Sequence, residues 1–401
     1  MTNQLGEART EHVIRLCQDL IRTRSYSGEE SSVAALLKEF FLKNGYDDAY
    51  ADAYGNMIGI MEGSGPGPTI VFDGHMDTVP VQDPDAWTQD PFGAQIIDGM
   101  LYGRGSSDMK CALACMAAAG AYFARDTGKK FAGRICVAGI VHEECFEGIA
   151  SREVSKALKP DLVVIGESSD LNLKIGQRGR AEILLETFGV PAHSSNPEKG
   201  VNAVYAMCKA VERIHHLEPS VHPFLGKGIL ELTDIQSLPY PGKSVVPEYC
   251  AATYDRRLLV GETRESVLAP IQKILDELKK EDPSFSGKVS YACGEETCYT
   301  GAKIGAERFF PAWLLEKEHP AVQRVMECFH ANGYDPEVTK YSFCTNGSHY
   351  CGEAGIPVLG MGPSSENIAH TIDEHVPVSQ IPAVTQIYMW MMEALMTGEA
   401  F

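Results

Sequence analysis

The feature of this sequence that most constrains its fold is the alternation of short, uninterrupted apolar runs with longer amphipathic segments. Apolar residues recur with helical spacing at residues 10–23, 29–44, 109–124 and 151–158. Buried strands are predicted where the apolar runs are too short for helices, at residues 69–72, 135–141, 162–165 and 357–361. This alternation predicts an α/β domain with a mainly parallel sheet and helices packed on its faces.

The order of elements changes in the middle of the chain. With 401 residues, the chain has room for two or three domains of about 150 residues each. Residues 179–294 read as strand, helix, strand, strand, helix, strand, which is the order of a ferredoxin-like α+β unit. We therefore expect an α/β domain formed by residues 1–178 and 295–401, with a ferredoxin-like domain inserted at residues 179–294.

The charge balance argues against two classes of partner. There are 35 Lys and Arg residues against 54 Asp and Glu, so the net charge is −19, and such a chain repels phosphate backbones and anionic lipid surfaces. The longest uncharged run, residues 111–124, is too short to cross a bilayer, and the first residues show no signal peptide. We expect a cytoplasmic protein that binds neither nucleic acid nor membrane.

The 12 cysteines are scattered and form no CxxC motif, so we interpret them as reduced thiols. Cys111 and Cys115 lie four residues apart on a predicted helix. That spacing also suits a metal site, but small buried apolar residues are the better interpretation.

Ionisable side chains gather where the predicted strands end. The first strand leads into His75 and Asp77, the second into Glu143 and Glu144, and the third into Glu167. The last strand leads through Gly362-Pro363 to His370, and Asp108 stands at the start of a predicted helix. Because open α/β sheets bind ligands at the carboxyl ends of their strands, these side chains are expected to lie together.

The chemistry of this set is that of a metal site. Histidines and carboxylates without a thiolate suit Zn²⁺, with Co²⁺ or Mn²⁺ as alternatives. Five ligands fit two ions about 3.5–4 Å apart if one carboxylate bridges them. Asp77 stands two residues after His75 and can orient its ring. Of the adjacent Glu143 and Glu144, one can ligate while the other serves as general base.

Each of these motifs alone has an ordinary structural interpretation. A single His-x-Asp is frequent by chance, and Glu143-Glu144 alone would suit a solvated loop. Glu167 alone suits a helix N-cap, and His370 a backbone contact. Their coincidence at one edge of one sheet is what favours a functional site.

Several motifs in combination resemble a known family over essentially the whole chain. It is the zinc-dependent aminoacylase, carboxypeptidase and dipeptidase family, which includes acetylornithine deacetylase, succinyl-diaminopimelate desuccinylase and glutamate carboxypeptidase. Within it, the chain is most similar to an uncharacterised branch of selenium-metabolism-linked hydrolases. The motifs are Gly74-His75-Met76-Asp77-Thr78-Val79-Pro80, Gly103-Arg104-Gly105 before Asp108-Met109-Lys110, Glu143-Glu144, Gly166-Glu167, Ala192-His193-Ser194 and Gly362-Pro363 before His370.

The resemblance implies a role for each matching residue. One of two divalent ions, most often Zn²⁺, would be held by His75 and Glu167, and the other by Glu144 and His370, with Asp108 bridging. Glu143 would be the general base and Asp77 the orienting acid. His193, in the inserted domain, would reach across a homodimer to polarise the scissile carbonyl. The inserted domain would accordingly act as a lid and dimerisation domain.

The chain also departs from the family pattern. Ser244 stands where many members have Asn, Ser168 where many have Pro, and Asn346-Gly347-Ser348 where Gly-x-Asp is usual. These departures bear on substrate contacts. Arg257 matches a family arginine suited to a substrate carboxylate, although a pair with Asp255 on the strand face is an equal alternative.

The function predicted from the sequence is that of a binuclear metallohydrolase of deacylase, aminoacylase or exopeptidase type. It would cleave the amide of an N-acyl amino acid or small peptide with a free carboxylate, by metal-bound hydroxide and a glutamate base. One alternative is a silent binding protein on the same fold. A weaker one is a serine hydrolase using Ser107 and Lys110 as an S-x-x-K pair, although Lys110 is better interpreted as a cation on a helix surface.

Overall fold

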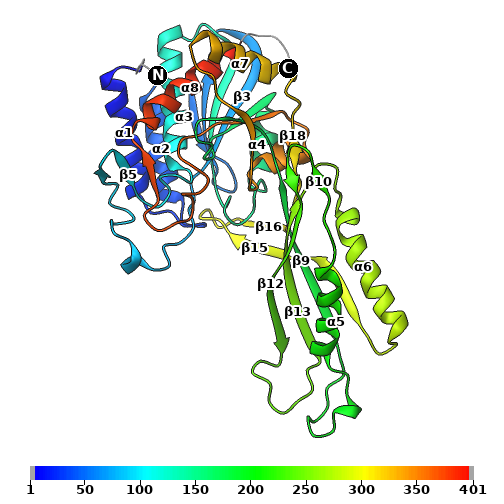
Figure 1. The fold of residues 1–401 in the computed structure, drawn as a ribbon. Helices are drawn as coiled ribbons and strands as arrows, with labels where there is room; N and C mark the ends of the chain where they lie inside the picture. Colours follow the sequence, from blue (N-terminus) through cyan, green and yellow to red (C-terminus); the bar gives the residue numbers. More distant parts are fainter. Residues whose placement is uncertain (1–4, 397–401) are drawn as a thin grey trace. The chain divides into compact units, whose positions relative to one another are not determined.

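The computed structural model describes residues 5–396, which form two compact units. Unit 1 comprises the residues up to Gln177, Glu295–Gly305 and the residues from Leu314 onward; unit 2 comprises Arg178–Gly294 and Ala306–Trp313. The sequence assigned residues 306–313 to the last α/β segment. They belong to unit 2 because β17 (Phe309–Phe310) pairs with β9 (Gly179–Phe188). In Figure 1 unit 2 is mostly green to yellow.

Unit 1 is built on a mixed sheet that contains nine strands within the described residues. The central strands β6, β3, β7 and β20 are parallel, and β2 and β1 continue the sheet antiparallel at one edge. The four predicted strands are therefore confirmed and adjacent. In sheet order the strands are β1 (Asp48–Ala51), β2 (Met57–Glu62), β6 (Ala132–Ile140), β3 (Gly65–His75), β7 (Leu162–Ile165), β20 (Val358–Gly360), β8 (Leu173–Gln177) and β18 (Trp313–Leu314), with β19 (Val338–Tyr341) beside β8.

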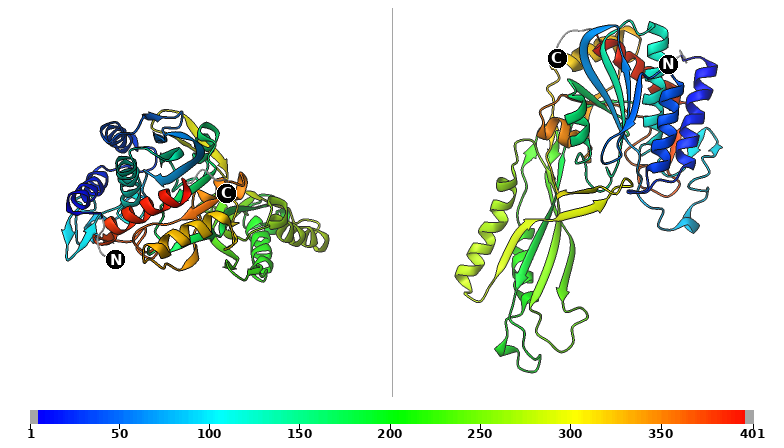
Figure 2. Two further views of the ribbon diagram at one scale, coloured as in Figure 1. Left: turned by 90° about the horizontal axis from the view of Figure 1, so that it is seen from above. Right: turned by 180° about the vertical axis from the view of Figure 1, so that it is seen from behind.

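Helices cover this sheet, as two further views show (Figure 2). They are α1 (Glu7–Arg22), α2 (Ser31–Lys43), α3 (Lys110–Thr127), α4 (Ser151–Leu158), α7 (Pro320–Ala331) and α8 (Gln380–Leu395). Helix α3 packs against β3, β6 and α8, and every residue from 110 to 124 is buried. Cys111 and Cys115 are among them and form no disulfide, as predicted. Among residues 5–396, no helix is long and apolar enough to span a membrane.

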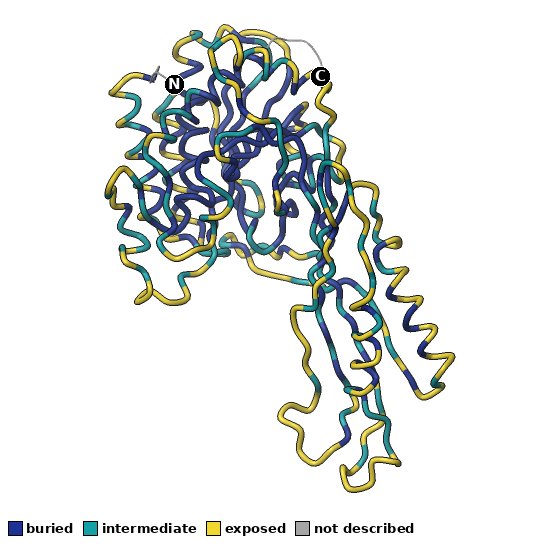
Figure 3. Tube along the Cα trace, in the orientation of Figure 1, coloured by how far each residue is buried: buried dark blue, intermediate teal, exposed yellow. Residues whose placement is uncertain are grey.

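Unit 1 also contains several shorter elements. A small antiparallel sheet joins β4 (Ile96–Ile97), β5 (Met100–Tyr102) and β21 (His375–Pro377). A 3₁₀ turn, η1, spans Pro84–Ala86, and a π-helical turn, η3, spans Ser348–Glu353. Figure 3 shows that the buried residues of this unit concentrate in its interior strands, while its peripheral loops are exposed.

Unit 2 has the predicted ferredoxin-like topology. Its antiparallel sheet has the order β12-β13-β9-β14, in which β9 and β13 are central, β12 is an edge strand, and β17 extends along β9 beside β14. Helices α5 and α6 pack together on one face of this sheet over an apolar core. The elements are β9, α5 (Ala203–His215), β12 (Ile229–Leu238), β13 (Tyr249–Leu258), α6 (Arg264–Glu281) and β14 (Gly287–Tyr291), with the short pair of β10 (Val221–His222) and β11 (Gly226–Lys227). A further hairpin, β15 (Cys293–Thr297) with β16 (Lys303–Glu307), has residues in both units.

Local signals explain where the helices of unit 2 begin. The Asn202 side chain accepts hydrogen bonds from the N–H groups of Val204 and Tyr205 at the start of α5. Thr263 and Ser266 form a capping box at the start of α6, which continues through Pro270. Burial alternates along β13, so that one face meets the helices and the other is partly exposed.

A buried polar network joins β3 to the loop before η3 in unit 1. The Asp73 carboxylate accepts hydrogen bonds from Asn346 Nδ2 at 2.9 Å and from the Tyr350 hydroxyl at 2.8 Å. Asn346 Oδ1 accepts from the N–H of Gly148 at 2.8 Å. Burial raises the pKa of Asp73 to about 6, although these donors oppose the shift. Asn346, a departure from the family pattern, is therefore a buried donor to a carboxylate.

Replacing Asn346 with Asp should destabilise the protein in a pH-dependent way. A second carboxylate would face Asp73 where an amide now donates, a change that costs about 2–4 kcal/mol for buried groups. The loss should be larger at pH 8 than at pH 5, because a proton shared by the two carboxylates relieves the repulsion. Urea unfolding at both pH values measures it, with the exposed Asn367→Asp as control. An equal loss at the two pH values would contradict this account.

Candidate metal centre

His75 ends β3 with its ring fully buried between polar groups. Its Nδ1 lies 2.8 Å from the backbone carbonyl of Asp77, so Nδ1 carries the proton and donates. Its Nε2 faces Asp108 Oδ1 at 2.8 Å and Glu167 Oε1 at 3.5 Å. A lone pair aimed at two carboxylates is repulsive unless a cation lies between them. A proton or a metal ion satisfies this arrangement, and the donor set fits Zn²⁺ or a similar ion.

A second histidine faces the other side of Asp108. His370 Nε2 lies 3.1 Å from Asp108 Oδ2 and 2.9 Å from Glu144 Oε2. The two oxygens of one carboxylate thus serve two histidines. His370 adopts a left-handed backbone conformation with φ 63°, which is uncommon for residues other than glycine, although His, like Asn and Asp, adopts it more often than most. The structure therefore brings together all five predicted ligands in unit 1.

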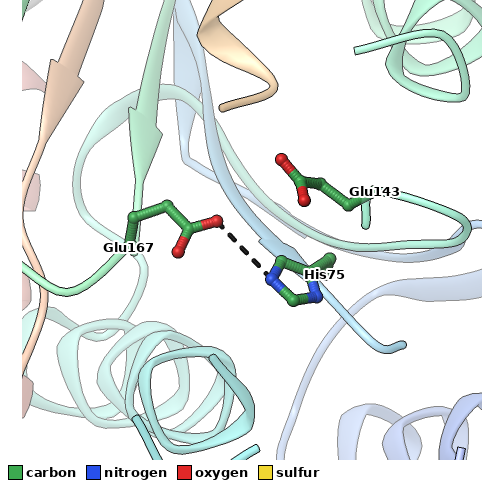
Figure 4. A group of neighbouring side chains, drawn as sticks. All are labelled: His75, Glu143 and Glu167. Atoms are coloured by element: carbon green, nitrogen blue, oxygen red, sulfur yellow. Dashed lines mark ion pairs between the residues drawn. The ribbon is translucent and has the colours of Figure 1, made fainter. Parts of the chain in front are cut away.

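Glu143 lies beside these groups without pairing with them. Figure 4 shows the side chains of His75, Glu143 and Glu167 turned toward one shared space, and ligand atoms of these three residues lie within 4.8 Å of one another. Glu143 is only 6% exposed, and its Oε1 has no hydrogen-bond partner among the described residues. Burial, with the neighbouring carboxylates of Glu167 and Glu144, raises the pKa of Glu143 well above its ordinary value. A buried carboxyl with a vacant oxygen is suited to accept and return a proton.

The Asp77 carboxylate positions backbone more directly than it positions the His75 ring. It accepts from the N–H groups of Glu143 at 3.1 Å and Glu144 at 3.3 Å, and from the Ser27 hydroxyl at 2.7 Å. Its Oδ1 is 3.5 Å from His75 Nδ1, whereas the Asp77 carbonyl is at 2.8 Å. The sequence indicated that Asp77 orients the ring. The closer contact to that ring is made by the main chain of Asp77.

Two residues that sequence reasoning did not assign hold the Asp108 loop. One Glu374 oxygen accepts from the N–H groups of Gly105, Ser107 and Asp108 at 2.8–3.1 Å. The other oxygen pairs with Arg104 Nη1 at 2.5 Å, and Glu374 itself is fully buried. Arg104 lies in the Gly103-Arg104-Gly105 motif, and Glu374 follows His370 by four residues, but neither has a sequence signal of its own. Their contacts join the Asp108 and His370 segments.

Ser168, another departure from the family pattern, fastens the same loop. Its hydroxyl donates to the carbonyl of Ser107 at 2.8 Å, and the Ser107 hydroxyl lies 3.0 Å from it. A proline at position 168 lacks this donor. Ser168 therefore links the segment after β7 to the residue before Asp108.

Lys110 corrects an expectation from the sequence. It was interpreted as a cation on a helix surface, but it is fully buried at the first position of α3. Its Nζ donates to the carbonyls of Leu20 at 3.2 Å and Thr23 at 2.8 Å, which lie at the end of α1 and offer carbonyls that the helix leaves unsatisfied. Burial lowers the pKa of Lys110 to about 7. Its amine is committed to α1 and does not form the Ser107–Lys110 pair that a serine mechanism needs.

The remaining predicted residues lie in unit 2. His193 is exposed, and its Nδ1 accepts from the N–H of Ser195 at 3.1 Å. Arg257, on β13, pairs with Asp255 at 2.8 Å, so the ion pair considered from the sequence is present. Ser244 has φ 55°, a left-handed conformation that Asn adopts more readily than most residues, which explains why Asn also suits this position.

The titration of the cluster predicts how stability depends on pH without metal. Burial raises the pKa of Glu144 to about 7 and that of Glu167 well above 4.5, and hydrogen bonds to Asp108 and Glu144 raise the pKa of His370 to about 10. Burial alone would lower the pKa of His75, but Asp108 and Asp77 raise it well above 6.5. Each group binds its proton more tightly in the folded chain. The stability that each group contributes is therefore full at pH values below its pKa in the unfolded chain. It is lost as the pH rises through the pKa of the group in the folded chain.

Metal-free protein should therefore lose thermal stability as pH rises from about 5.5 to 9, by several degrees. Asp108 and Lys110 have the opposite sign. The two histidine partners of Asp108 outweigh burial and lower its pKa, so its contribution is lost only in strong acid. Burial lowers the pKa of Lys110 to about 7, so this residue offsets part of the loss above pH 7, but the four groups with raised pKa values outweigh it. Thermal unfolding of chelator-treated protein across this range measures the slope. Saturating Zn²⁺ should flatten it. A melting temperature that rises with pH in the chelated protein would contradict this account.

Comparison with known proteins places this geometry in a family. Residues 71–394 match the model of peptidase family M20/M25/M40. The chain is 33% identical over 380 residues to the uncharacterized protein YgeY of Escherichia coli K12, covering 93% of this chain and 92% of that one. It is 30% identical over 405 residues to succinyl-diaminopimelate desuccinylase 2 of Ruegeria sp. TM1040, covering 96% of each.

Solved structures share the fold at lower identity. Aminopeptidase PepT of Bacillus cereus ATCC 10987 superposes with a TM-score of 0.74 at 18% identity, covering 96% of this chain and 98% of that one. The Bacillus subtilis protein YXEP superposes with a TM-score of 0.72 at 12% identity, covering 99% and 100%. The chain thus belongs to peptidase family M20/M25/M40 and is a metallohydrolase of amide or peptide bonds.

Proposed function

We propose that this protein is a binuclear amidohydrolase that cleaves N-acyl amino acids or small peptides with a free carboxylate. The observation that carries the proposal is the position of Asp108, whose two oxygens face two histidines while Glu143 stands beside them with a vacant, buried oxygen. His75 and Glu167 would hold one ion, and Glu144 and His370 the other. The B. subtilis neighbour is described as a dinuclear metal binding peptidase, and the Ruegeria relative as a desuccinylase, which supports this proposal.

The residues of the chain would divide the reaction between them. When bound, two divalent ions, Zn²⁺ first and Co²⁺ or Mn²⁺ as alternatives, supply positive charge that polarises a carbonyl and acidifies water. Glu143 Oε1 would take the proton of the attacking water and return it to the leaving nitrogen. Its Oε1 has no hydrogen-bond partner among the described residues, so this oxygen is available to accept that proton. Asp77 would keep Glu143 in place through the main chain.

His193 would contribute a hydrogen bond to the developing oxyanion. Because the N–H of Ser195 donates to Nδ1 at 3.1 Å, the neutral ring carries its proton on Nε2. That nitrogen is therefore a donor, as oxyanion stabilisation requires. Arg257 would bind the substrate carboxylate, which means exchanging part of its contact with Asp255, 2.8 Å away.

We also propose that the protein forms a homodimer through unit 2. β12 is an edge strand of the unit 2 sheet, and it carries three exposed apolar side chains, Ile229, Ile235 and Leu238. An exposed edge with apolar side chains favours pairing with another strand. A second copy would cover this edge and bring its own His193 toward the neighbouring active site, as the resemblance implies.

The cytoplasm remains the proposed location. Cys17, Cys111 and Cys115 are buried thiols with no disulfide between them, as a reducing compartment favours. The net charge of −19 still disfavours nucleic acid and anionic membrane surfaces as partners.

Glu143→Gln should lower kcat by about 10²–10⁴-fold, because it removes the proton acceptor while keeping the shape of the side chain. The metal content should stay at about two ions per chain, since Glu143 is not a predicted ligand. Elemental analysis and hydrolysis of an N-acyl amino acid panel, before and after chelation, measure both. Glu39→Gln, on exposed α2, is the control. Full activity in the variant would remove Glu143 from the mechanism, and a wild-type protein that binds metal without turnover would favour the silent binding protein.

Ile235→Lys should convert the dimer to a monomer, because it places an ammonium in the proposed strand pairing. Sedimentation velocity should give about twice 43.7 kDa for the wild type and about 43.7 kDa for the variant. Val260→Lys, at an exposed apolar residue outside β12, should leave the dimer intact. A monomeric wild type would rule out the proposed interface.

A further inference from the structure

A pocket of about 400 Å³ opens beside the predicted metal centre within unit 1. His370 lines it, so whatever fills this pocket lies next to a predicted metal ligand. Four of the lining side chains are apolar, namely Val79, Pro80, Trp87 and Ile372. Ile372 is 55% exposed, so its side chain is accessible to a ligand in the pocket.

Hydrogen bonds join two of the segments that line the pocket. Trp87 follows η1 in one segment, and Ile372 precedes Asp373 in the other. The Asp373 carboxylate accepts from the N–H of Thr88 at 2.8 Å and from its hydroxyl at 2.8 Å. These bonds hold together the two segments that carry Trp87 and Ile372, so this part of the pocket is formed before any ligand enters.

The charges around the pocket disfavour an anionic ligand. Arg104 is the one Arg or Lys side chain in the lining, but Glu374 pairs with it at 2.5 Å and Trp87 stacks on it at 5.2 Å. Its Nε has no hydrogen-bond partner among the described residues but is buried, so a ligand in the pocket does not reach it.

His370, the other basic residue of the lining, would be a neutral ligand once metal is bound. Asp83, exposed in the same lining, adds a negative charge. The remaining polar residue of the lining, Gln82, offers a neutral amide and no positive charge. An acyl group with a terminal carboxylate would therefore enter the pocket without a cationic partner.

We propose that this pocket receives a neutral, apolar acyl group larger than acetyl, and that Trp87 and Ile372 are the residues that select it. This inference rests on the proposed amidohydrolase function and names its substrate class. A succinyl group is then a poor substrate, in contrast to the named activity of the Ruegeria relative. The selectivity would arise from apolar contact and from the absence of an available cation.

The test uses three substrates that carry the same amino acid and differ only in the acyl group: N-acetyl, N-succinyl and N-(4-methylpentanoyl). The last is the apolar isostere of the second, because two methyl groups replace the carboxylate oxygens. The wild type should prefer the apolar isostere to the succinyl compound by at least about tenfold in kcat/KM. Trp87→Ala should lower kcat/KM for the isostere by about 10–100-fold and that for N-acetyl by less than about threefold.

Matched variants distinguish the effect of the pocket residues on acyl-group selectivity from general effects of a substitution on the enzyme. Ile372→Ala should lower kcat/KM for the isostere by about 3–10-fold. Leu42→Ala removes an aliphatic side chain of similar exposure, 58%, on α2 and should change nothing. Asp83→Asn should raise kcat/KM for N-succinyl by about twofold, since this carboxylate is exposed and screened. A wild type that prefers N-succinyl, or a Trp87→Ala variant that loses all three activities equally, overturns the inference.

A binding measurement decides the inference independently of turnover. Trp313 and Trp390 are buried, so a ligand in the pocket should quench mainly the fluorescence of Trp87. The Trp87→Phe variant lacks this fluorescence, and comparison with it isolates the contribution of Trp87. 4-Methylpentanoate should quench this signal and succinate should not. If no acyl amide is cleaved in a chelator-sensitive way but 4-methylpentanoate still binds, the proposed function fails while the pocket assignment stands. If neither acid binds, or succinate binds more tightly, the pocket assignment is wrong.

Discussion

Asp108 shares its carboxylate between two histidines, and the rest of the candidate site is arranged around that sharing. His75 and His370 approach its two oxygens at 2.8 and 3.1 Å, and each histidine also faces a glutamate. The glutamates and Asp108 are all largely buried, so their negative charges lack the water that would stabilise them. Such a cluster is stable only with cations among its members. Protons serve this purpose in the metal-free chain, and two divalent ions would serve it in the active enzyme.

The sheet is what brings these distant residues to one place. His75 ends β3, and Glu144, Glu167 and His370 follow β6, β7 and β20; these four parallel strands are adjacent in the sheet. Parallel strands end at the same edge, so each strand delivers its first polar residues to a common site. Apolar side chains within the strands exclude water from beneath it. The same arrangement that buries Val71, Val163 and Leu359 therefore places the charged residues.

The difference between local and long-range contacts explains how much of the structure could be predicted from the sequence alone. The short apolar strands and the polar residues after them are local signals, which is why the sheet, the ferredoxin-like topology and the clustering of the five predicted ligands could be predicted. Lys110 was misjudged because its burial depends on α1, nearly 90 residues earlier in the chain. Glu374 was missed for a similar reason, since its partners lie 266–270 residues away and a single Glu after a His has no distinctive pattern. The contact of the Asp77 carboxylate with two backbone N–H groups depends on the path of a loop, which residue spacing does not specify.

Two kinds of buried charge coexist in this site, and the difference between them bears on how metal binding is coupled to folding. Glu374 is balanced by Arg104 and by three N–H groups, so it holds the Asp108 loop whether or not metal is bound. The predicted ligands lack such balance and depend on cations. Because the supporting groups are satisfied on their own, the ligands are held near their working positions before ions arrive. The free energy of metal binding then relieves repulsion between the carboxylates and is not consumed in ordering the loops that carry them.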